Sequence, residues 1–385
     1  MASKKSDDRK TLVIVGAGGY GGVLAHELSV KFHASKLDYN LVVINPRPYY
    51  LHNVASARSV VSALDNLEER ALIPYDNLFV NGNGTFIQSK VISIQEKGRG
   101  LGGHLKLANG DSVAYDALVL SPGSTWPGPI GLPDDHDALC AQLTEWRAKF
   151  AAAKEIAVVG GGAVGIELAG EIRDIYPNKK IYLIHAASLP LNDAFPDKFR
   201  SFLAQIITRR NIELVLGDRL EVPPEGTVGV TTQNGRHLPN VDLVIPCVGP
   251  KPNSAFISSL GPAVLSERGF VKVDPTFEVQ GHPGVFAVGH ICDLPEQKQL
   301  GKNYWHLPVA SANIIRFLAG QPLTKVYKAP PESLAVSVGK TDGATYFGYL
   351  WGIVLGQWVT GMIKGPLFIN LYRKKLGLLP EAPRL

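Results

Sequence analysis

The feature that most constrains this chain is a glycine motif set between an apolar run and a helical pattern, and it occurs twice. The first copy follows residues 11–15, whose β-branched apolar side chains predict a buried parallel strand. Gly16 then makes a tight turn, Gly18 lets the backbone approach a pyrophosphate, and Gly21 lets the following helix pack closely on the strand. The free N–H groups and the positive dipole at such a helix start hold phosphates. This arrangement predicts a dinucleotide site.

The second copy begins about 145 residues later, after a similar apolar run at residues 155–159. Gly160, Gly162 and Gly165 repeat the spacing, and a helical pattern continues from Ile166. One such motif in the right context is a moderate signal, whereas two indicate two dinucleotide sites in one chain. We interpret them as one site for a flavin dinucleotide and one for a nicotinamide dinucleotide.

Other short apolar runs, several of them ending at a glycine, predict further strands, at 41–44, 117–120, 181–184, 242–249 and 284–289. The run at 117–120 leads into a turn that contains Gly123. In a doubly wound fold such strand ends lie at the ligand crevice. We therefore predict an α/β chain with two Rossmann-like dinucleotide-binding domains, the second inserted into the first. The expected parts are an FAD-binding domain at 11–126 and 245–330, an NAD(P)H-binding domain at 127–244, and a small membrane-facing region at 331–385.

Composition narrows the class of protein further. Hydrophobic residues make up 45% of the chain and charged residues 19%, which excludes an intrinsically disordered protein. The three cysteines, Cys140, Cys247 and Cys292, are far apart and form no CxxC pair. We therefore expect no disulfide framework, no zinc or other metal site and no dithiol redox centre. The first residues lack the apolar segment of a secretory signal peptide, so we expect a cytoplasmic protein.

The formal charge of +5 is concentrated towards the C-terminal end of the sequence. Residues 364–385 contain five basic residues and one acidic residue, so they carry +4 of that charge. A basic segment behind an apolar stretch is typical of proteins that bind a membrane surface, more than of proteins that bind nucleic acid. We expect a peripheral membrane protein with no specific nucleic-acid partner; a solvated basic face is the alternative.

The apolar stretch itself, residues 343–363, has no charge and is just long enough to cross a bilayer. Its five glycines and Gln357 argue against a membrane span. We expect a shallow helix whose glycine face, with Gly348, Gly352 and Gly356, packs on the flavin domain while the other face enters the lipid. The basic residues that follow are expected to meet anionic head groups, namely Arg373, Lys374 and Lys375.

Four stretches, at 52–58, 160–167, 183–185 and 337–343, carry a more specific signal than the glycines alone. Together with both glycine motifs they make the chain resemble the pyridine-nucleotide:flavin oxidoreductases, and within that group the ferroptosis suppressor and apoptosis-inducing-factor-like branch. The similarity covers about residues 11–376. It implies bound FAD, oxidation of NADH or NADPH, and reduction of a lipid quinone of the ubiquinone or vitamin K type at a membrane.

The resemblance also assigns roles to residues. Glu167 matches a position near the nicotinamide and the flavin, and Lys364 matches a lysine close to the flavin edge, so these two are the candidate catalytic residues. The alternative for Glu167 is an acid that only stabilises a helix start. The alternative for Lys364 is membership of a surface basic cluster. The other implied cofactor contacts are His52 and Arg58 along the flavin, Lys251 and Asn253 in the turn after Gly249 beside the nicotinamide, and His306 with Leu307 at the start of a helix that stabilises the reduced flavin.

Three positions depart from the usual pattern of such sites. The acid that normally ends the second strand and binds ribose is replaced by Asn45, and the usual Gly-Asp at the ribityl chain is Gly289-His290, with Asp293 nearby. Each change replaces a charge-assisted hydrogen bond worth about 1.5–3 kcal/mol by a neutral one worth about 1 kcal/mol. Either FAD is held less tightly, or Asp293 compensates, or the chain is a flavin-free relic. In the second unit the matching position is His185, which does not repel a 2′-phosphate, so both NADH and NADPH are expected to serve.

Two other functions compete with a membrane-surface NAD(P)H:quinone oxidoreductase. One is a mitochondrial type II NADH dehydrogenase, although the first ten residues mix acidic and basic side chains, unlike a transit peptide. The other is a non-catalytic death or signalling effector that binds nucleic acid, for which the basic segment is the only support. Reduction of the flavin by NADH distinguishes the enzyme from the effector.

Overall fold

The computed structural model describes residues 9–349, 352–364 and 367–381. Its first unit is built on a six-stranded sheet in the order β18-β19-β9-β1-β2-β5. The central strand β1 pairs in parallel with β2 on one side and β9 on the other, so its apolar residues are almost fully buried. The strands of this sheet are β1 (Thr11–Val15), β2 (Asn40–Asn45), β5 (Thr85–Gln88), β9 (Ala117–Leu120), β18 (Glu278–Val279) and β19 (His282–Ala287).

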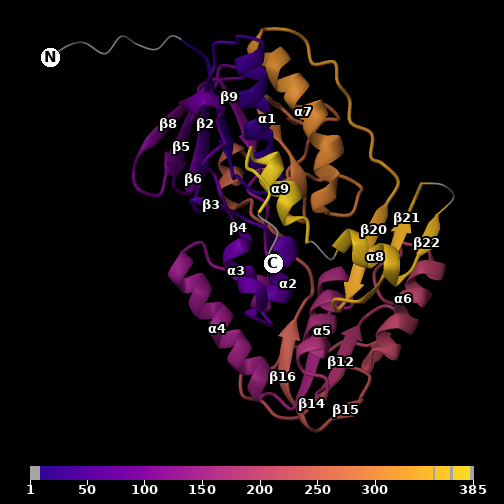
Figure 1. Cartoon of the computed structure of the whole chain (residues 1–385). Helices are drawn as coiled ribbons and strands as arrows, with labels where there is room; N and C mark the ends of the chain where they lie inside the picture. Colours follow the sequence, from indigo (N-terminus) through magenta and orange to yellow (C-terminus); the bar gives the residue numbers. More distant parts are fainter. Residues whose placement is uncertain (1–8, 350–351, 365–366, 382–385) are drawn as a thin grey trace.

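Helices and a second sheet complete this unit. The helices α1 and α7 pack on each other beside the sheet (Figure 1), and an antiparallel sheet of β6, β7 and β8 contributes to the same core. Short elements lead from β2 towards the second unit. The bounds are α1 (Gly21–Ala34), β3 (Tyr49–Leu51), α2 (Ser56–Ser59), α3 (Leu67–Arg70), β4 (Leu72–Pro74), β6 (Val91–Glu96), β7 (Gly103–Leu107), β8 (Ser112–Tyr115) and α7 (Asn303–Leu318).

The second unit contains a four-stranded parallel sheet in the order β13-β12-β11-β16 and has its own core. Its last strand, β16, ends at Pro246, one residue beyond the expected start of the returning flavin segment at residue 245. The chain passes between the two units twice, and we call the two connecting segments the crossings. They are joined by the antiparallel pairing of β10 (Ser124–Thr125) with β17 (Lys251–Pro252). The remaining elements are α4 (His136–Ala152), β11 (Glu155–Val159), α5 (Ala163–Ile175), β12 (Lys180–His185), α6 (Asp197–Arg209), β13 (Ile212–Leu216), β14 (Val230–Thr231), β15 (His237–Leu238) and β16 (Val241–Pro246).

The C-terminal region differs from the single helix that the glycine spacing predicts. It forms an antiparallel sheet of β20 (Ser333–Val338), β21 (Asp342–Phe347) and β22 (Ile353–Leu355), followed by α8 (Gln357–Lys364) and α9 (Ile369–Lys375). Gly343 and Gly352 adopt positive φ angles of 153° and 78°, which a continuous helix does not permit. The predicted glycine face on a helix at 343–363 is therefore wrong. Residues 350 and 351 of that stretch lie outside the described part.

This region contacts both units. Val336, Val338 and Ala344 of the new sheet belong to the core of the second unit, where β20 lies against α5. Ile369 and Tyr372 of α9 belong to the core of the first unit, and Figure 1 shows α9 beside α1. The chain end thus spans the boundary between the two Rossmann-like units.

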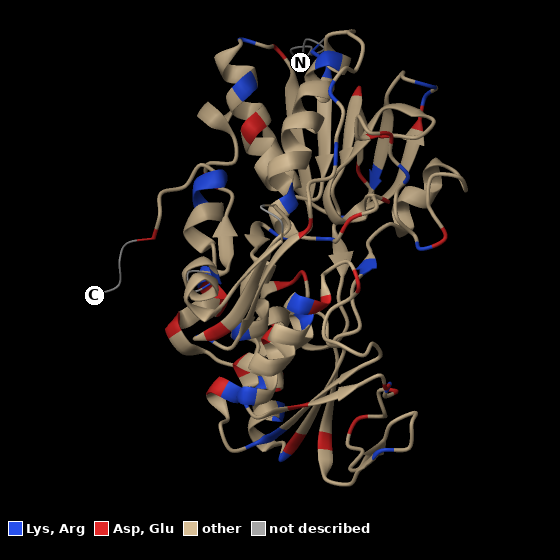
Figure 2. Ribbon diagram, turned by 90° about the vertical axis from the view of Figure 1, so that its right-hand side faces the viewer, with Lys and Arg blue, Asp and Glu red and all other residues tan. Residues whose placement is uncertain are grey.

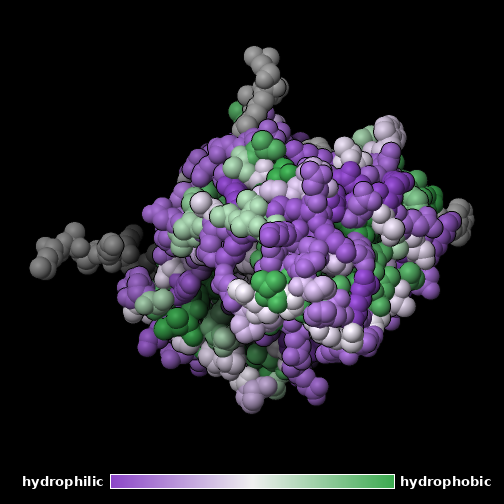
Figure 3. All heavy atoms as spheres, turned by 90° about the horizontal axis from the view of Figure 1, so that it is seen from below, coloured by the Kyte–Doolittle hydropathy of each residue, from purple (hydrophilic) through white to green (hydrophobic). Residues whose placement is uncertain are grey.

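Figure 2 shows basic and acidic positions interspersed over both units. From below, the molecule is mostly hydrophilic, with hydrophobic residues in separate patches (Figure 3). Within the residues that the structure describes, no helix combines the length and apolar character needed to cross a bilayer.

Candidate functional site

The first glycine turn has the close contacts that the sequence predicts. A Cβ atom added at Gly21 would lie 1.9 Å from the Gly16 carbonyl oxygen, so a side chain there would force α1 away from β1. At Gly18, by contrast, no described atom lies within 4 Å of such a Cβ, and the residue is exposed. The backbone at the start of α1 is therefore open on the side where a pyrophosphate approaches.

The second glycine turn repeats these relations. A Cβ at Gly165 would lie 1.9 Å from the Gly160 carbonyl oxygen, and at Gly162 no described atom comes within 4 Å. The two helix starts are thus built alike, each with one glycine for close packing and one open towards a ligand. This geometry fits two dinucleotides, FAD at the first turn and NAD(P)H at the second.

The residues that end the second strand of each unit also play matching roles. Asn45 Oδ1 accepts a hydrogen bond from the Ala17 amide at 3.0 Å, and its Nδ2 donates to the Arg47 carbonyl. His185 Nδ1 accepts from the Gly161 amide at 3.2 Å, and its Nε2 lies 2.9 Å from the Leu191 carbonyl. Because Nδ1 accepts, the Nε2 nitrogen is the donor to the Leu191 carbonyl. Both side chains therefore hold their glycine turns, a role that the sequence did not suggest.

The two candidate catalytic residues meet although they are almost 200 positions apart in the sequence. Lys364 Nζ at the end of α8 lies 2.7 Å from Glu167 Oε1 on α5, and each side chain is only 14% exposed. The alternatives in which Glu167 only stabilises a helix start or Lys364 belongs to a solvated cluster do not explain this pairing. The ion pair joins the C-terminal region to the nicotinamide unit.

A small cavity lies beside this pair, at the junction of the two units. Its volume is about 50 Å³, and the first unit and Trp126 line it on one side while Val164 and Glu167 line it on the other. Ser56 also lines it, and its buried Oγ has no hydrogen-bond partner within the described residues. An unpartnered buried hydroxyl costs stability unless a ligand or water satisfies it, which fits a cofactor or acceptor at this junction.

His52 lies in a closed aromatic cluster on the flavin side. Its Nε2 lies 2.6 Å from the Leu367 carbonyl, its Nδ1 lies 3.0 Å from the Tyr50 hydroxyl, and the Tyr372 ring packs on it. Burial lowers the pKa of His52 to about 4, despite the hydrogen bond to Leu367. The imidazole is therefore neutral, and it connects the predicted flavin segment to the residues that follow Lys364.

Arg58, which the resemblance places along the flavin, makes an ion pair across the unit boundary. Its Nε lies 2.9 Å from Glu171 Oε1 on α5, and Glu171 is almost fully buried. Burial raises the pKa of Glu171, and the Arg58 charge counteracts that effect. The contact with flavin stays a prediction, but the pair fixes α2 against the second unit.

The turns that carry the other predicted nicotinamide contacts lie together. The Asn253 amide donates to the Gly123 carbonyl at 3.0 Å, which brings the two crossings between the units into contact. Gly249 has a φ of 100° and no described atom within 4 Å of an added Cβ, while Lys251 is exposed. The turn is therefore accessible, and its contact with the nicotinamide stays a prediction.

The turn at Gly289, where the ribityl chain is expected, is hydrogen-bonded to a histidine. The Gly289 amide donates to His306 Nδ1 at 3.3 Å, so His306 Nε2 donates to Glu296 at 2.9 Å. Burial lowers the pKa of the neighbouring His290 to about 4, and its buried Nε2 has no partner in the described part of the chain. His290 is therefore neutral, with a free ring nitrogen at the position where the family pattern has an acid.

The buried Glu296 is the centre of this network. Burial alone would raise its pKa, but hydrogen bonds from His306 and Tyr327 and the charge on Lys302 lower it to about 2. Lys302 is 3% exposed and lies 3.3 Å from Glu296 and 2.6 Å from Glu332. No local motif predicts this network, because its members are separated in the sequence by up to 36 positions, from Glu296 to Glu332.

One expectation near this turn needs correction. The helix predicted to begin at His306 begins at Asn303, and Leu307 is buried in the core. Asp293, considered as a substitute for the missing acid, lies 3.2 Å from Arg268, and its contact with FAD stays a prediction. At the start of α7, Asn303 Nδ2 donates to the Gly19 carbonyl.

Two Rossmann-like units with open glycine turns, joined at a cavity beside a Glu–Lys pair, define a flavin-dependent oxidoreductase that uses a nicotinamide dinucleotide. The sequence profile of one family, described as pyridine nucleotide-disulphide oxidoreductase, matches residues 10–307. The chain belongs to this family, and its cofactors are FAD and NAD(P)H.

Individual relatives agree with this assignment. The chain is 43% identical to the FAD-dependent oxidoreductase FVFD30 of Flammulina velutipes over 79% of its own length and 94% of the relative. It is 32% identical to apoptosis-inducing factor homolog B of Dictyostelium discoideum, over 96% and 98% of the two chains. It is 28% identical to ferroptosis suppressor protein 1 of Taeniopygia guttata, over 98% and 99%. The predicted resemblance is thereby confirmed.

Among solved structures, the sulfide:quinone oxidoreductase of Aquifex aeolicus has a similar fold. The TM-score is 0.74 over 96% of this chain and 92% of that one, with 16% sequence identity. This likeness confirms the predicted α/β architecture.

Proposed function

We propose that this flavin-dependent NAD(P)H oxidoreductase reduces a lipid quinone at a membrane surface. The observation that carries the proposal is the Glu167–Lys364 ion pair beside the junction cavity, because it puts a cation of the C-terminal region next to the nicotinamide unit. The names of several relatives also support a role close to that of ferroptosis suppressor protein 1.

The residues at this junction have separate tasks in the proposal. FAD, when bound, takes a hydride from NAD(P)H and supplies two electrons to the acceptor. Lys364 offers three N–H donors, of which Glu167 takes one, and in the described part of the chain its side chain has no other ion-pair partner. In the proposal the remaining donors hold a quinone carbonyl oxygen. A positive charge there stabilises the negative charge that develops on the oxygen. Glu167 keeps the ammonium in position.

The cysteines support a direct transfer to a small acceptor. Cys140, Cys247 and Cys292 are free thiols, and burial raises the pKa of Cys247 to about 12 and that of Cys292 further still. Such thiols are poor nucleophiles. The proposed route from the flavin therefore uses no disulfide.

The surface that leads to Lys364 is apolar. Trp358 and Met362 of α8 are 76% and 63% exposed, and Ile353 of β22 is 41% exposed. The opposite side of α8 is anchored, since Thr360 is buried and its hydroxyl lies 2.8 Å from that of Thr345. An exposed apolar helix face with Trp at its rim is typical of a monotopic contact with lipid. A quinone with a long tail would approach Lys364 along this face.

The basic residues contribute less to this surface than the sequence suggested. Lys375 points inward: its Nζ lies 3.6 Å from the centre of the Tyr304 ring and 2.9 Å from Asn303 Oδ1. Among the three basic residues expected to meet head groups, Lys374 is exposed and Arg373 is half-buried. We propose peripheral attachment on the cytoplasmic side, with a lipid droplet, the plasma membrane and the outer mitochondrial membrane as candidate sites.

The activity is tested by adding NADH without oxygen to the purified protein. We expect the visible flavin absorption to bleach within seconds and to return when ubiquinone or a vitamin K quinone is added. An unbleached flavin would favour the non-catalytic effector, whereas bleaching with no reoxidation by any quinone would refute the acceptor while leaving the oxidoreductase intact.

The lipid contact is tested with Trp358→Asp combined with Met362→Asp. Both side chains are highly exposed, so the folded structure should persist, while flotation with anionic liposomes and reduction of a long-tailed quinone in them should fall at least tenfold. Reduction of a short, water-soluble quinone should stay within twofold. Val228→Asp is the matched control, because Val228 is 68% exposed in the second unit, away from α8. Equal activity of the double variant and the control on the long-tailed quinone would overturn the placement.

A further inference from the structure

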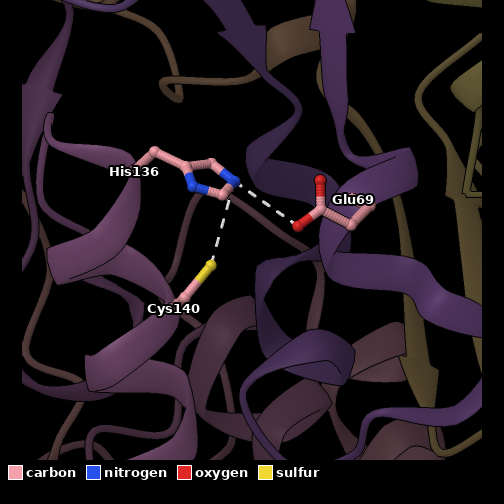
Figure 4. Close-up of side chains that lie close together, drawn as sticks. All are labelled: Glu69, His136 and Cys140. Atoms are coloured by element: carbon pink, nitrogen blue, oxygen red, sulfur yellow. Dashed lines mark hydrogen bonds and ion pairs between the residues drawn. The ribbon is translucent and has the colours of Figure 1, made fainter.

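A cluster outside the redox site joins three side chains of metal-binding type. Figure 4 shows Glu69, from α3, together with His136 and Cys140, both from α4. His136 Nε2 lies 3.4 Å from Glu69 Oε1 and 3.9 Å from Cys140 Sγ, and the three ligand atoms all lie within 4.8 Å of one another. The same ring nitrogen faces both partners, as it would if all three shared one ion.

The separation of His136 from Glu69 matches that of a tetrahedral zinc site, and Cys140 would have to move closer to both. Zinc bonds of about 2.0–2.1 Å to nitrogen and oxygen and about 2.3 Å to sulfur place the ligand atoms about 3.3–3.6 Å apart. A contraction of a few tenths of an ångström between Sγ and Nε2 is sufficient for that pair. His136 and Cys140 stand four positions apart, so they share one face of the same helix.

The surroundings support a divalent cation. The other ring nitrogen, His136 Nδ1, lies 3.5 Å from Oδ1 of the exposed Asp137, a carboxylate within reach of the metal-bound imidazole. The Tyr49 ring stacks edge-on against His136, with centroids 6.3 Å apart. A thiolate and a carboxylate would balance the charge of a divalent ion, and a fourth position remains open to solvent because all three residues are partly exposed.

We propose that Glu69, His136 and Cys140 bind one borderline-soft divalent cation, with Zn²⁺ as the best match, and that this ion ties α3 to α4. A mixed sulfur, nitrogen and oxygen set suits such a metal, whereas Mg²⁺ and Ca²⁺ prefer oxygen alone. On binding, the Cys140 thiol gives its proton to solvent and the metal takes its place.

The site would link the two units. Leu67 of α3 belongs to the core of the first unit, and Leu139 and Leu143 of α4 belong to that of the second. Arg147 of α4 already contacts Glu68 at 3.2 Å. The metal would add a second link along the same helix pair. The proposal does not depend on which acceptor the flavin reduces.

The test uses the full-length holoprotein, stripped with a chelator and titrated with Co²⁺ without oxygen. A cobalt ion bound through a thiolate should give ligand-field bands at wavelengths longer than those of oxidised flavin, with one ion per chain. Cys140→Ser should abolish the sulfur-to-cobalt charge-transfer band, and His136→Ala should weaken binding at least tenfold. Glu145→Gln, on the same helix outside the cluster, is the matched control and should bind as the wild type does.

Zinc gives a second readout that does not depend on colour. Stoichiometric Zn²⁺ should raise the midpoint of thermal unfolding of the wild type and the control, but not of Cys140→Ser. Three results would each overturn the proposal: no cobalt bands in the wild type, undiminished binding by Cys140→Ser, or binding that needs millimolar metal. Because flavin reduction by NADH is recorded on the same samples, failure here is distinguishable from failure of the oxidoreductase assignment.

Discussion

At the scale of single residues, the Glu167–Lys364 pair predicts how much a contact between distant parts of the chain contributes to the free energy of unfolding. Removing one partner leaves the other charge nearly buried, so Lys364→Met should lower the free energy of unfolding by about 2–4 kcal/mol. The double change Glu167→Gln with Lys364→Met should recover most of that loss. Urea unfolding followed by tryptophan fluorescence measures both.

An exposed ion pair gives the control for these single and double substitutions. Arg268 is 74% exposed beside Asp293, so Arg268→Met should change the unfolding free energy by less than about 1 kcal/mol. If the single and double changes at Glu167 and Lys364 had additive effects, the two residues would not be coupled in solution.

His52 makes a prediction about pH. Its folded pKa of about 4 is below its ordinary value of 6.5, so the unfolded chain binds a proton first as the pH falls. The contribution of His52 to the free energy of unfolding is fully present above about pH 6.5. It is lost as the pH falls towards 4, by roughly 3 kcal/mol in all. His52→Gln, which cannot titrate, should flatten unfolding free energy against pH in that window. A curve parallel to that of the wild type would contradict the assignment.

Residue roles were predictable only where a local pattern or a family pattern carried them. The glycines that allow close packing follow from their spacing, and the Glu167 and Lys364 positions follow from the resemblance. Glu171 as the partner of Arg58 did not follow, since the two are 113 positions apart and Glu171 lies outside the stretches that carry the resemblance. The Glu69–His136–Cys140 cluster was missed for the same reason: a search for paired cysteines does not find a site with one cysteine.

At the scale of elements, the parallel strands and the two helices after the glycine turns were predictable because each is encoded within about 20 residues. The C-terminal sheet was not. Glycines every four residues imitate a helical face, but glycine is a poor helix former, and the aromatic residues between them favour strands. The true helix, α8, begins only at Gln357. Packing on α5 decides whether this segment forms a helix or a sheet. The local sequence contains no information about that packing.

That packing yields a prediction at Gly170. A Cβ atom added there would lie 2.2 Å from the Gly339 backbone nitrogen, so Gly170→Ala should push the loop after β20 away from α5. We expect a loss of about 1–3 kcal/mol in unfolding free energy, together with faster hydrogen exchange in β20 and β21. Gly361→Ala in α8 is the matched control: no described atom lies within 4 Å of its Cβ, and alanine should stabilise the helix by up to about 1 kcal/mol. Similar effects of the two changes would refute the close approach.

At the scale of the whole molecule, two similar units lie side by side, and the C-terminal region contacts the cores of both. The pseudo-repeat was visible in the sequence because both glycine motifs keep their spacing. How the units are joined was not visible, since the junction is formed by side chains from distant segments, including Arg58 with Glu171 and Arg147 with Glu68. The sequence therefore predicts what each unit binds better than it predicts where the acceptor enters.

The position of the C-terminal region on both cores also has a consequence for biosynthesis. Both Rossmann-like units precede it on the chain, and at about 5–20 residues per second a ribosome needs roughly 3–11 s to make residues 331–385. During that interval the glycine turns exist, but Lys364 has not reached Glu167 and α9 does not yet cover the first unit. The glycine turns of both units are therefore synthesised before the segment that pairs with Glu167. Premature termination before α8 would leave a chain that has both glycine turns but lacks Lys364, the residue that we propose holds the acceptor.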